Sequence, residues 1–163
     1  MRGIVLVIFS LFTIFISDAV AQNSLEKDVQ TLVNNWHHDA AVANADAYFG
    51  AMTSEAVFLG TDATERWTKT EFREWSKKYF ESKKTWDFKT KERYVYFSSD
   101  KKTAWWDEKL DTWMGVCAGA GVAVLTSDGW KIAHYQLAIM IPNEKVKSLQ
   151  ELLQPNSKPE HKE

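Results

Sequence analysis

Two apolar segments in the second half of the chain each contain a side chain suited to acid–base chemistry. Glu108 follows Trp106 by two residues, and His134 precedes Gln136 by two residues. Because side chains two apart on a β-strand share a face, two neighbouring strands could direct all four into one cavity. A carboxylate, an imidazole and an amide against an aromatic wall form a site that can transfer protons or bind a small molecule.

A purely structural role is the alternative for the same residues. Glu108 could pair with Arg93 or Lys109 on a solvated face, and His134 could hydrogen-bond a backbone carbonyl. The period of two also leaves open whether Glu108 or Asp107 faces inward. If Glu108 lies against the aromatic wall, we expect burial to raise its pKa even beside His134, because a low dielectric disfavours the charged carboxylate.

Short apolar runs separated by turn residues predict the strands that would position these side chains. β-branched and aromatic residues dominate from residue 86 onward, and Ser127-Asp128-Gly129 is typical of a hairpin turn. The predicted strands cover residues 86–97, 103–113, 119–125 and 130–141. Pairing of consecutive strands then gives an antiparallel sheet.

Helical spacing dominates the first half of the chain. A first helix is predicted from Asn23, with apolar residues at intervals of three and four up to Trp36, and a second over residues 46–52. Thr68 and Glu71 form a capping box before a third helix. We therefore expect an α+β domain in which N-terminal helices cover one face of a cone-shaped, curved antiparallel sheet.

The N-terminal segment has the pattern of an export signal. Arg2 gives a basic start, residues 4–16 are an apolar run, and Ala19 and Ala21 fit a cleavage site. The apolar run would rise about 20 Å as a helix, short of the ~30 Å hydrocarbon core of a membrane. We therefore expect residues 1–21 to be a cleaved signal peptide, no stable membrane anchor after cleavage, and a periplasmic or secreted protein.

Length and charge limit the remaining possibilities. The 163 residues suit one domain, which we place at residues 22–144, followed by a helical turn and mobile tail over residues 145–163. A net charge of −2 gives no overall positive field to hold nucleic acid, so we expect no such partner.

Cofactor and metal signatures are missing from the sequence. The chain has one cysteine, Cys117, and no nucleophile elbow, zincin helix, Walker loop or dinucleotide-binding glycine motif. His37 and His38 are adjacent, and neighbours on a helix point about 100° apart, which disfavours shared metal ligation. We expect neither a metal nor a cofactor.

Three stretches resemble the SnoaL-like branch of the nuclear transport factor 2-like superfamily. They are residues 58–67 (FLGTDATERW), 104–108 (AWWDE) and 129–137 (GWKIAHYQL). The first is similar to secreted or periplasmic bacterial members, and the resemblance covers residues 25–144. Relatives often read Arg-Gly-Ser-Gly-Val where residues 118–122 read Ala-Gly-Ala-Gly-Val, so a cation and a hydroxyl are missing here.

The resemblance implies a cone-shaped fold with a pocket between helices and sheet, often in a homodimer. Its members include steroid isomerases, polyketide cyclases and a transport adaptor, so the fold alone does not identify a reaction. It also implies that Glu65 lies near the cavity mouth, either in the pocket or paired with Arg66. Trp67 and Tyr48 could stack on a ligand or belong to the core. We assign the following tryptophans to packing: Trp36, Trp75, Trp86, Trp113 and Trp130.

Three functions are compatible with this sequence. The leading one is binding of a small, largely apolar or aromatic molecule in an aromatic-lined pocket. The candidate ligand-binding residues are Tyr48, Glu65, Trp67, Trp106 and Gln136. The second is a cofactor-free isomerase, dehydratase or hydrolase, with Glu108 or Asp107 as general base and His134 or Tyr48 as general acid.

The third function is a structural module that dimerises and keeps only a vestigial pocket. A sheet covered on one side leaves a second face open, and Tyr94, Tyr96 and Trp105 could be exposed there. We therefore expect a homodimer through the outer face of the sheet.

Overall fold

The computed structural model describes the backbone of residues 4–154 and the side chains of residues 22–154. Its helices are α1 (Ile4–Ala41), α2 (Ala45–Gly50), α3 (Lys69–Glu81) and α4 (Val146–Leu152), with a 3-10 turn at Asn143–Lys145. Its strands are β1 (Met52–Leu59), β2 (Arg66–Thr68), β3 (Lys89–Phe97), β4 (Thr103–Thr112), β5 (Gly115–Thr126) and β6 (Gly129–Ile139). The tail predicted beyond residue 154 lies outside the described residues.

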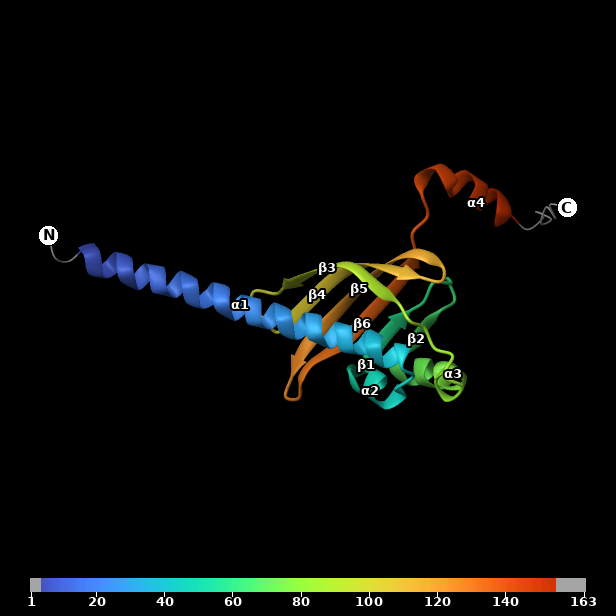
Figure 1. The fold of residues 1–163 in the computed structure, drawn as a ribbon, viewed down its shortest axis with the longest axis horizontal. Coiled ribbons are helices and arrows are strands. Elements are labelled where there is room, and N and C mark those ends of the chain that lie inside the picture. The colour runs from blue at the N-terminus through green and yellow to red at the C-terminus, as the bar shows by residue number, and fades with distance from the viewer. Residues whose placement is uncertain (1–3, 155–163) are drawn as a thin grey trace.

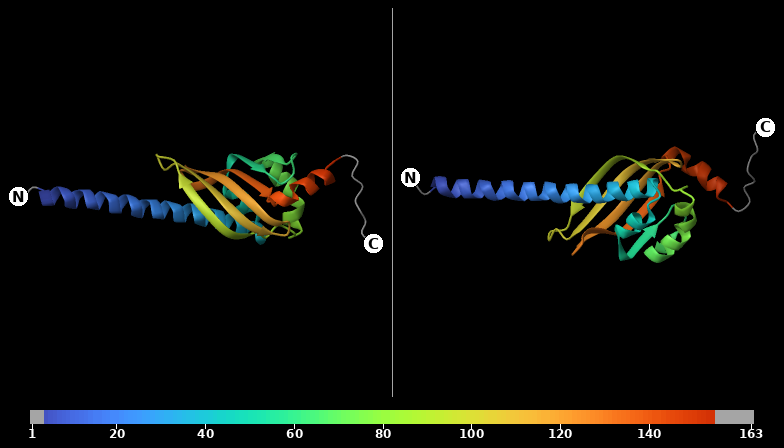
Figure 2. Two further views of the ribbon diagram at one scale, coloured as in Figure 1. Left: turned by 90° about the horizontal axis from the view of Figure 1, so that it is seen from above. Right: turned by 60° about the horizontal axis from the view of Figure 1, so that its bottom comes forward.

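The strands form one curved sheet in the order β2-β1-β6-β5-β4-β3. Strands β3 to β6 pair antiparallel with their sequence neighbours, as the turn residues predicted. Strand β1 pairs parallel with β6 and antiparallel with β2, so the sheet is mixed rather than wholly antiparallel. Helices α1, α2 and α3 lie on one face of the sheet, which confirms the expected α+β arrangement (Figures 1 and 2).

Strands β1 and β2 lie in the half of the chain that was predicted to be helical. The predicted second helix extends to Met52, but α2 ends at Gly50 and β1 begins at Met52. β1 is placed by its parallel partner β6, about eighty positions later, with Phe58 opposite Tyr135. Sequence periodicity is a local signal, so it does not reveal a pairing over such a distance. Strand β2 has only three residues, which is too short to show a period of two.

Helix α1 runs without a break from Ile4 to Ala41, so no helix begins at Asn23. Its buried apolar side chains follow at intervals of four, three and four: Val29, Val33, Trp36 and Ala40. No helix within the described residues is long and apolar enough to cross a membrane. Cleavage after Ala21 stays a prediction.

Helix α3 begins where the capping box predicted. Thr68 Oγ1 accepts from the backbone N–H of Glu71 at 3.3 Å, and the Glu71 carboxylate accepts from the backbone N–H of Thr68 at 2.8 Å. These reciprocal bonds satisfy backbone donors that a helix start leaves free. They also fix the point where β2 turns into α3.

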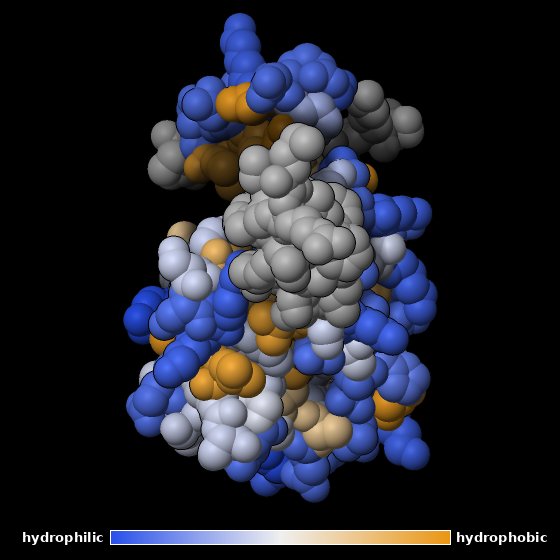
Figure 3. Space-filling view, turned by 90° about the vertical axis from the view of Figure 1, so that its left-hand side faces the viewer, coloured by the Kyte–Doolittle hydropathy of each residue, from blue (hydrophilic) through white to orange (hydrophobic). Residues whose placement is uncertain are grey.

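Alternation along β4 determines which side chains enter the interior. Ala104, Trp106, Glu108 and Leu110 are buried, whereas the residues between them are exposed. On the outer face, Tyr94, Tyr96 and Trp105 are 55%, 45% and 44% exposed, respectively. Figure 3 views the domain from the end where α1 leaves it and shows a mainly hydrophilic surface with separate hydrophobic patches.

Candidate functional site

A cavity of about 350 Å³ opens between α3, the β1–β2 hairpin and the β4–β5 turn. We call it the aromatic pocket, because eight of its twelve lining side chains are aromatic. The lining residues are Phe58, Thr61, Glu65, Trp67, Phe72, Trp75, Tyr79, Trp86, Phe88, Trp113, Met114 and Leu137. Aromatic walls of this kind suit a flat apolar ligand.

Contacting rings from β1, β2 and α3 form the wall of the aromatic pocket. Trp67 is stacked on Phe72 at 5.4 Å between ring centres and lies 4.7 Å from Trp75. Phe72 also stacks on Phe58 at 4.1 Å and on Trp86 at 5.9 Å. Residues three apart on a helix are neighbours, so α3 supplies Phe72 and Trp75 to the same wall. The wall is therefore part of the core rather than a set of mobile side chains.

The loop between β1 and β2 fixes Glu65 at the edge of the pocket. The backbone N–H of Gly60 donates to Glu65 O at 2.8 Å, and that of Glu65 donates to Asp62 O at 3.0 Å. Asp62 Oδ1 accepts from both the backbone N–H and the hydroxyl of Thr64, at 2.8 and 2.6 Å. A side chain on Gly60 would overlap the Glu65 carboxylate. The G-T-D-A-T-E motif therefore encodes an ordered loop that holds one carboxylate in place.

Trp113 contributes to the pocket from the β4–β5 turn. Thr112 Oγ1 donates to Gly115 O at 2.9 Å and accepts from the backbone N–H of Met114 at 3.0 Å. Gly115 has a φ of +92°, which side-chain-bearing residues rarely adopt. Trp113 itself is 83% exposed, so it adds little to the core and is free to cover a ligand.

A second cluster of polar side chains is buried deeper, around Glu108. Glu108 Oε1 is hydrogen-bonded to His37 Nε2 at 2.9 Å and accepts from Tyr135 Oη at 2.9 Å. The Trp106 indole N–H donates to the same oxygen at 3.4 Å. Arg93 donates to Oε2 from Nε and Nη2, at 2.9 and 2.7 Å. Both carboxylate oxygens are thus occupied by side-chain donors.

The same cluster ties α1 to the sheet. Arg93 Nη1 donates to Asn34 Oδ1 at 2.7 Å and to Gln30 Oε1 at 3.1 Å, both on α1. The Arg93 and Glu108 side chains are 2% and 0% exposed. A buried ion pair needs this kind of full hydrogen bonding, because desolvation of two charges is costly. The cluster therefore acts as a polar joint between helix and sheet.

The expected rise in the pKa of Glu108 is wrong. Burial alone would raise it, but hydrogen bonds and positive charge from His37 and Arg93 lower the pKa of Glu108 to about 2. Burial and the neighbouring Glu108 carboxylate raise the pKa of Tyr135 well above its ordinary value. The alternative interpretation, in which Glu108 has a structural role and pairs with Arg93 or Lys109, included the correct partner, Arg93. The Arg93–Glu108 pair is buried, however, rather than solvated.

The expected convergence of Glu108 and His134 is also wrong, because they lie on opposite faces of the sheet. Strand β6 has an irregularity at Ala133, where the register with β5 shifts between Val122 and the next residue. Ile132 and Tyr135 are both buried as a result, and His134 faces the other way. A strict period of two from Ile132 had predicted the reverse.

The remaining predicted site residues separate into three groups. Glu65 and Trp67 line the aromatic pocket. Trp106 and Tyr48 are buried in the core, where Tyr48 is stacked on Trp36 at 4.8 Å between ring centres. Gln136 is exposed on the outer face, as is the alternative base Asp107. The sequence therefore predicted two of the residues that line the aromatic pocket but not the other lining residues.

Three tryptophans that we assigned to packing line the aromatic pocket: Trp75, Trp86 and Trp113. Trp75 is 39% exposed and Trp113 is 83% exposed, which a packing role does not explain. The available signal for Trp113 was its place beside Met114-Gly115 at a strand end, where a large apolar residue at a turn is unusual. Trp36 and Trp130 are buried, as predicted.

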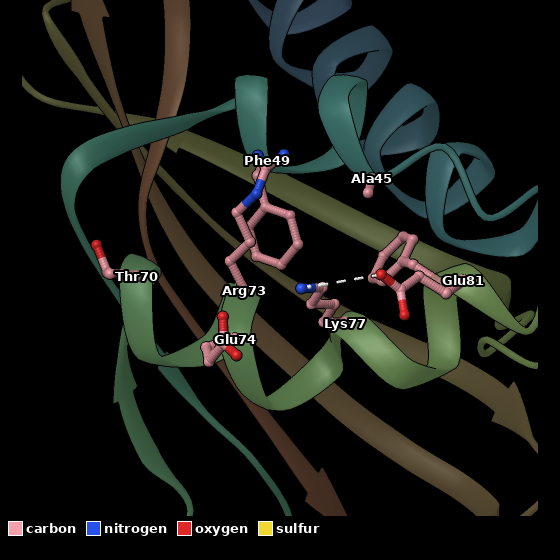
Figure 4. A pocket seen from close by; sticks show the side chains of 8 residues that line it. Ala45, Phe49, Thr70, Arg73, Glu74, Lys77 and Glu81 are labelled. Carbon is pink, nitrogen blue, oxygen red and sulfur yellow. Dashed lines mark ion pairs between the residues drawn. The ribbon is translucent and has the colours of Figure 1, made fainter.

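A second groove bordered by α3 lies between α2 and α3 (Figure 4). Its volume is about 500 Å³, and exposed charged side chains of α3 border it. These charges pair with each other or with α2: Lys77 with Glu81 at 4.0 Å, and Arg73 with Asp46 at 2.6 Å. Glu74 also borders the groove and has no ion pair among the described residues, but one exposed carboxylate does not make a ligand site. Among the described residues, no three His, Cys, Asp or Glu side chains are grouped to hold a metal ion.

A family model for the SnoaL-like domain matches residues 29–142. The chain belongs to this family. No curated protein sequence matches the chain. The match covers the C-terminal part of α1, α2, α3, the whole sheet and both clusters described above, so this SnoaL-like domain contains its pocket within the family fold.

Solved structures with the same fold are distant in sequence. An NTF2-like protein of unknown function from Pseudomonas putida KT2440 has a TM-score of 0.58 at 10% identity, covering 76% of this chain and 92% of that one. A candidate aromatic ring hydroxylase from Novosphingobium aromaticivorans has 0.56 at 19%, covering 71% and 88%. A candidate ketosteroid isomerase from Parabacteroides distasonis has 0.52 at 12%, covering 68% and 86%. These similarities show the fold alone.

Proposed function

We propose that this SnoaL-like domain binds a small, flat, largely apolar or aromatic molecule in the aromatic pocket. The observation that carries this proposal is the composition of the wall, where eight of twelve lining side chains are aromatic around about 350 Å³. Burial of a ring against such side chains is favourable both through the area removed from water and through ring–ring contact. Two structural neighbours, a candidate aromatic ring hydroxylase and a candidate ketosteroid isomerase, are named for an aromatic ring and a steroid, which are both cyclic and largely apolar.

The enzyme hypothesis built on Glu108 loses its general base. A carboxylate with a pKa of about 2 and donors on both oxygens has little tendency to take a proton near neutral pH. Glu108 is also absent from the lining of the aromatic pocket. We therefore assign Glu108 to the joint between α1 and the sheet and propose binding as the function of the pocket.

Export and dimerisation belong to the same proposal. Among the side chains of α1 that the structure describes, from Gln22 onward, Val29 is the first that is buried, and Gln22 Oε1 accepts a hydrogen bond from Lys101 Nζ at 3.1 Å. Cleavage after Ala21 would therefore leave these contacts intact and release the domain outside the cytoplasm. The outer-face aromatics Tyr94 and Trp105 would be buried in a homodimer.

Binding is tested with N-phenyl-1-naphthylamine, an uncharged aromatic probe whose fluorescence rises in an apolar environment. We expect saturable binding that Trp113→Ala weakens about tenfold, because one face of the probe loses its ring contact. Trp113 is 83% exposed, so the variant should unfold at the wild-type temperature. A loss of affinity without a loss of stability would place the ligand in the pocket.

The matched control is Trp105→Ala, which removes an exposed tryptophan from the outer face. Its affinity for the probe should equal that of the wild type. If Trp105→Ala weakens binding and Trp113→Ala does not, the ligand site lies on the outer face. If neither the wild type nor either variant binds the probe, the pocket is vestigial and the structural function replaces the binding function.

A further inference from the structure

The aromatic pocket contains a single acidic side chain and no basic one. Glu65 is the only carboxylate among the lining residues, and no lysine, arginine or histidine is among them. Within the described residues Glu65 forms no ion pair. The neighbouring Arg66 interacts with Glu71 instead. Hydrogen bonds from Thr68, and to a smaller extent the charge of Arg66, lower the pKa of Glu71. The pocket therefore has a negative charge with no protein cation beside it.

The loop holds the Glu65 carboxylate in a defined position. The backbone N–H of Asp62 donates to Glu65 Oε2 at 3.2 Å, while the Glu65 backbone is bonded to both Gly60 and Asp62. Gly60 is required beside it, because a Cβ there would overlap Oε2 and approach the Glu65 side chain closely. A single amide donor leaves most of the acceptor capacity of the carboxylate unused.

Aromatic faces add to the negative potential of the pocket. The π-system of an aromatic ring is negative over its face, and tryptophan attracts cations most strongly. Four tryptophans line the pocket together with Glu65: Trp67, Trp75, Trp86 and Trp113. The Trp67 and Trp75 rings lie 4.7 Å apart and are tilted by 32°, so they form adjoining walls rather than one flat surface.

We propose that the ligand of the aromatic pocket carries an alkylated ammonium group, which lies beside Glu65 and against the tryptophan faces. This inference rests on the proposed binding function and specifies its ligand class. A tertiary or quaternary ammonium suits the site better than a primary one, because it has one N–H donor or none to satisfy. A primary ammonium has three donors, and the polar side chains of the lining are few: Glu65, Thr61 and the hydroxyl of Tyr79. The weaker hydration of an alkylated cation also lowers the cost of its transfer into an aromatic cage.

The test compares two probes of nearly equal shape, (4-hydroxyphenyl)trimethylammonium and 4-tert-butylphenol. They differ in one atom and one positive charge. Titration calorimetry of the full-length protein should give at least about tenfold tighter binding for the ammonium probe, the size of a desolvated cation–π contact with a carboxylate nearby. The preference should weaken as salt is added, because Glu65 lies at the edge of the pocket.

Glu65→Gln should reduce this preference several-fold while it leaves binding of 4-tert-butylphenol unchanged. Glutamine keeps an oxygen that can accept from Asp62, so the loop should keep its structure. Gly60→Ala keeps the charge but displaces the carboxylate, and we expect it to reduce the preference as well. Glu55→Gln is the matched control, because Glu55 is exposed on β1 and does not line the pocket.

Three results separate this inference from the proposed function. Equal affinity for the two probes, or a preference that Glu65→Gln leaves unchanged, overturns the ammonium inference. If Trp113→Ala still weakens 4-tert-butylphenol in that case, apolar binding in the pocket stands. Failure of both probes and of the naphthylamine probe overturns the binding function itself, and the ammonium inference with it.

Discussion

His37 of α1 and Glu108 of β4 are joined by a 2.9 Å hydrogen bond in the interior of the domain. The bond crosses the boundary between the helical layer and the sheet, and Arg93 holds the other oxygen of the same carboxylate. A residue that the sequence suggested as a general base is therefore the centre of a joint that positions α1. Its removal should affect stability before it affects binding.

Glu108→Gln tests that joint directly. The substitution leaves the buried Arg93 guanidinium without a counter-charge, and we expect it to lower the free energy of unfolding by about 3–5 kcal/mol. Urea unfolding measures the change. Glu92→Gln is the control, because Glu92 pairs with Lys109 on the exposed surface and should contribute little. Equal stability of Glu108→Gln and the wild type would show that the joint is dispensable.

The low pKa of Glu108 also predicts how stability depends on pH. The folded protein has a pKa of about 2 at Glu108, below the ordinary 4.5, so protons bind the unfolded chain at higher pH than they bind the fold. This contribution is complete above about pH 4.5 and is lost as the pH falls toward about 2. The stability difference between wild type and Glu108→Gln, measured from about pH 6 to about pH 2, should shrink over that range. A difference that stays constant would contradict the prediction.

Gly121→Ala should destabilise the fold from the opposite strand. A Cβ at Gly121 would overlap the ring of Trp106, which is buried at 2% exposure. Overpacking of this kind costs about 1–3 kcal/mol, and thermal unfolding measures it. Ala120→Ser, on the neighbouring exposed position of β5, is the control and should keep the wild-type melting temperature. The opposite ranking of the two variants would mean that the interior adapts at Trp106.

The outer face of the sheet should form a homodimer. Light scattering at micromolar concentration should give twice the mass of one chain, and Trp105→Glu should reduce it to the monomer, because a carboxylate would be desolvated in the interface. Val42→Glu adds the same charge to an exposed apolar residue between α1 and α2 and should leave the dimer intact. A wild-type protein that is monomeric at these concentrations would contradict the proposed homodimer.

Export should yield a product that begins near Gln22. The residues Ala19 and Ala21 meet the small-residue requirement for signal cleavage. Intact-mass measurement of the secreted or periplasmic fraction should therefore show a chain that lacks residues 1–21. Replacing Ala21 with a bulky residue, as in Ala21→Trp, should block cleavage there. A full-length product that stays with the membranes would point to an anchor instead.

Local signals were sufficient for the parts of the fold that local interactions determine. The capping box at Thr68 and Glu71 predicted the start of α3, and turn residues predicted the pairing of β3 to β6. Alternation along β4 correctly put Trp106 and Glu108 on one face. The parallel pairing of β1 with β6 had no local signature, because its partner lies far along the chain.

The prediction of the candidate site was wrong where one extra residue in a strand reversed which of its side chains face inward. Because of the irregularity at Ala133, the side chain of His134 lies on the opposite face from that of Ile132. No residue type in β6 indicates this irregularity in the sequence. Glu108 lost its expected pKa shift because His37 approaches it from α1, and a helix-to-sheet contact cannot be read from spacing within either segment. Glu65 and Trp67 were found because the loop that holds them is a recognisable sequence block.

The link between α1 and β4 also bears on the order in which the protein can fold. His37 and Glu108 are 71 positions apart, and the Arg93 contacts with α1 span 59 and 63 positions. During N-to-C-terminal emergence from a ribosome or a translocation pore, α1 appears first, but its polar joint with the sheet cannot form until β3 and β4 have followed. Contacts so distant in sequence form late, because the loop between them must close first. The nascent chain should therefore stay loose until most of it has emerged, a state that passage through a narrow export channel requires.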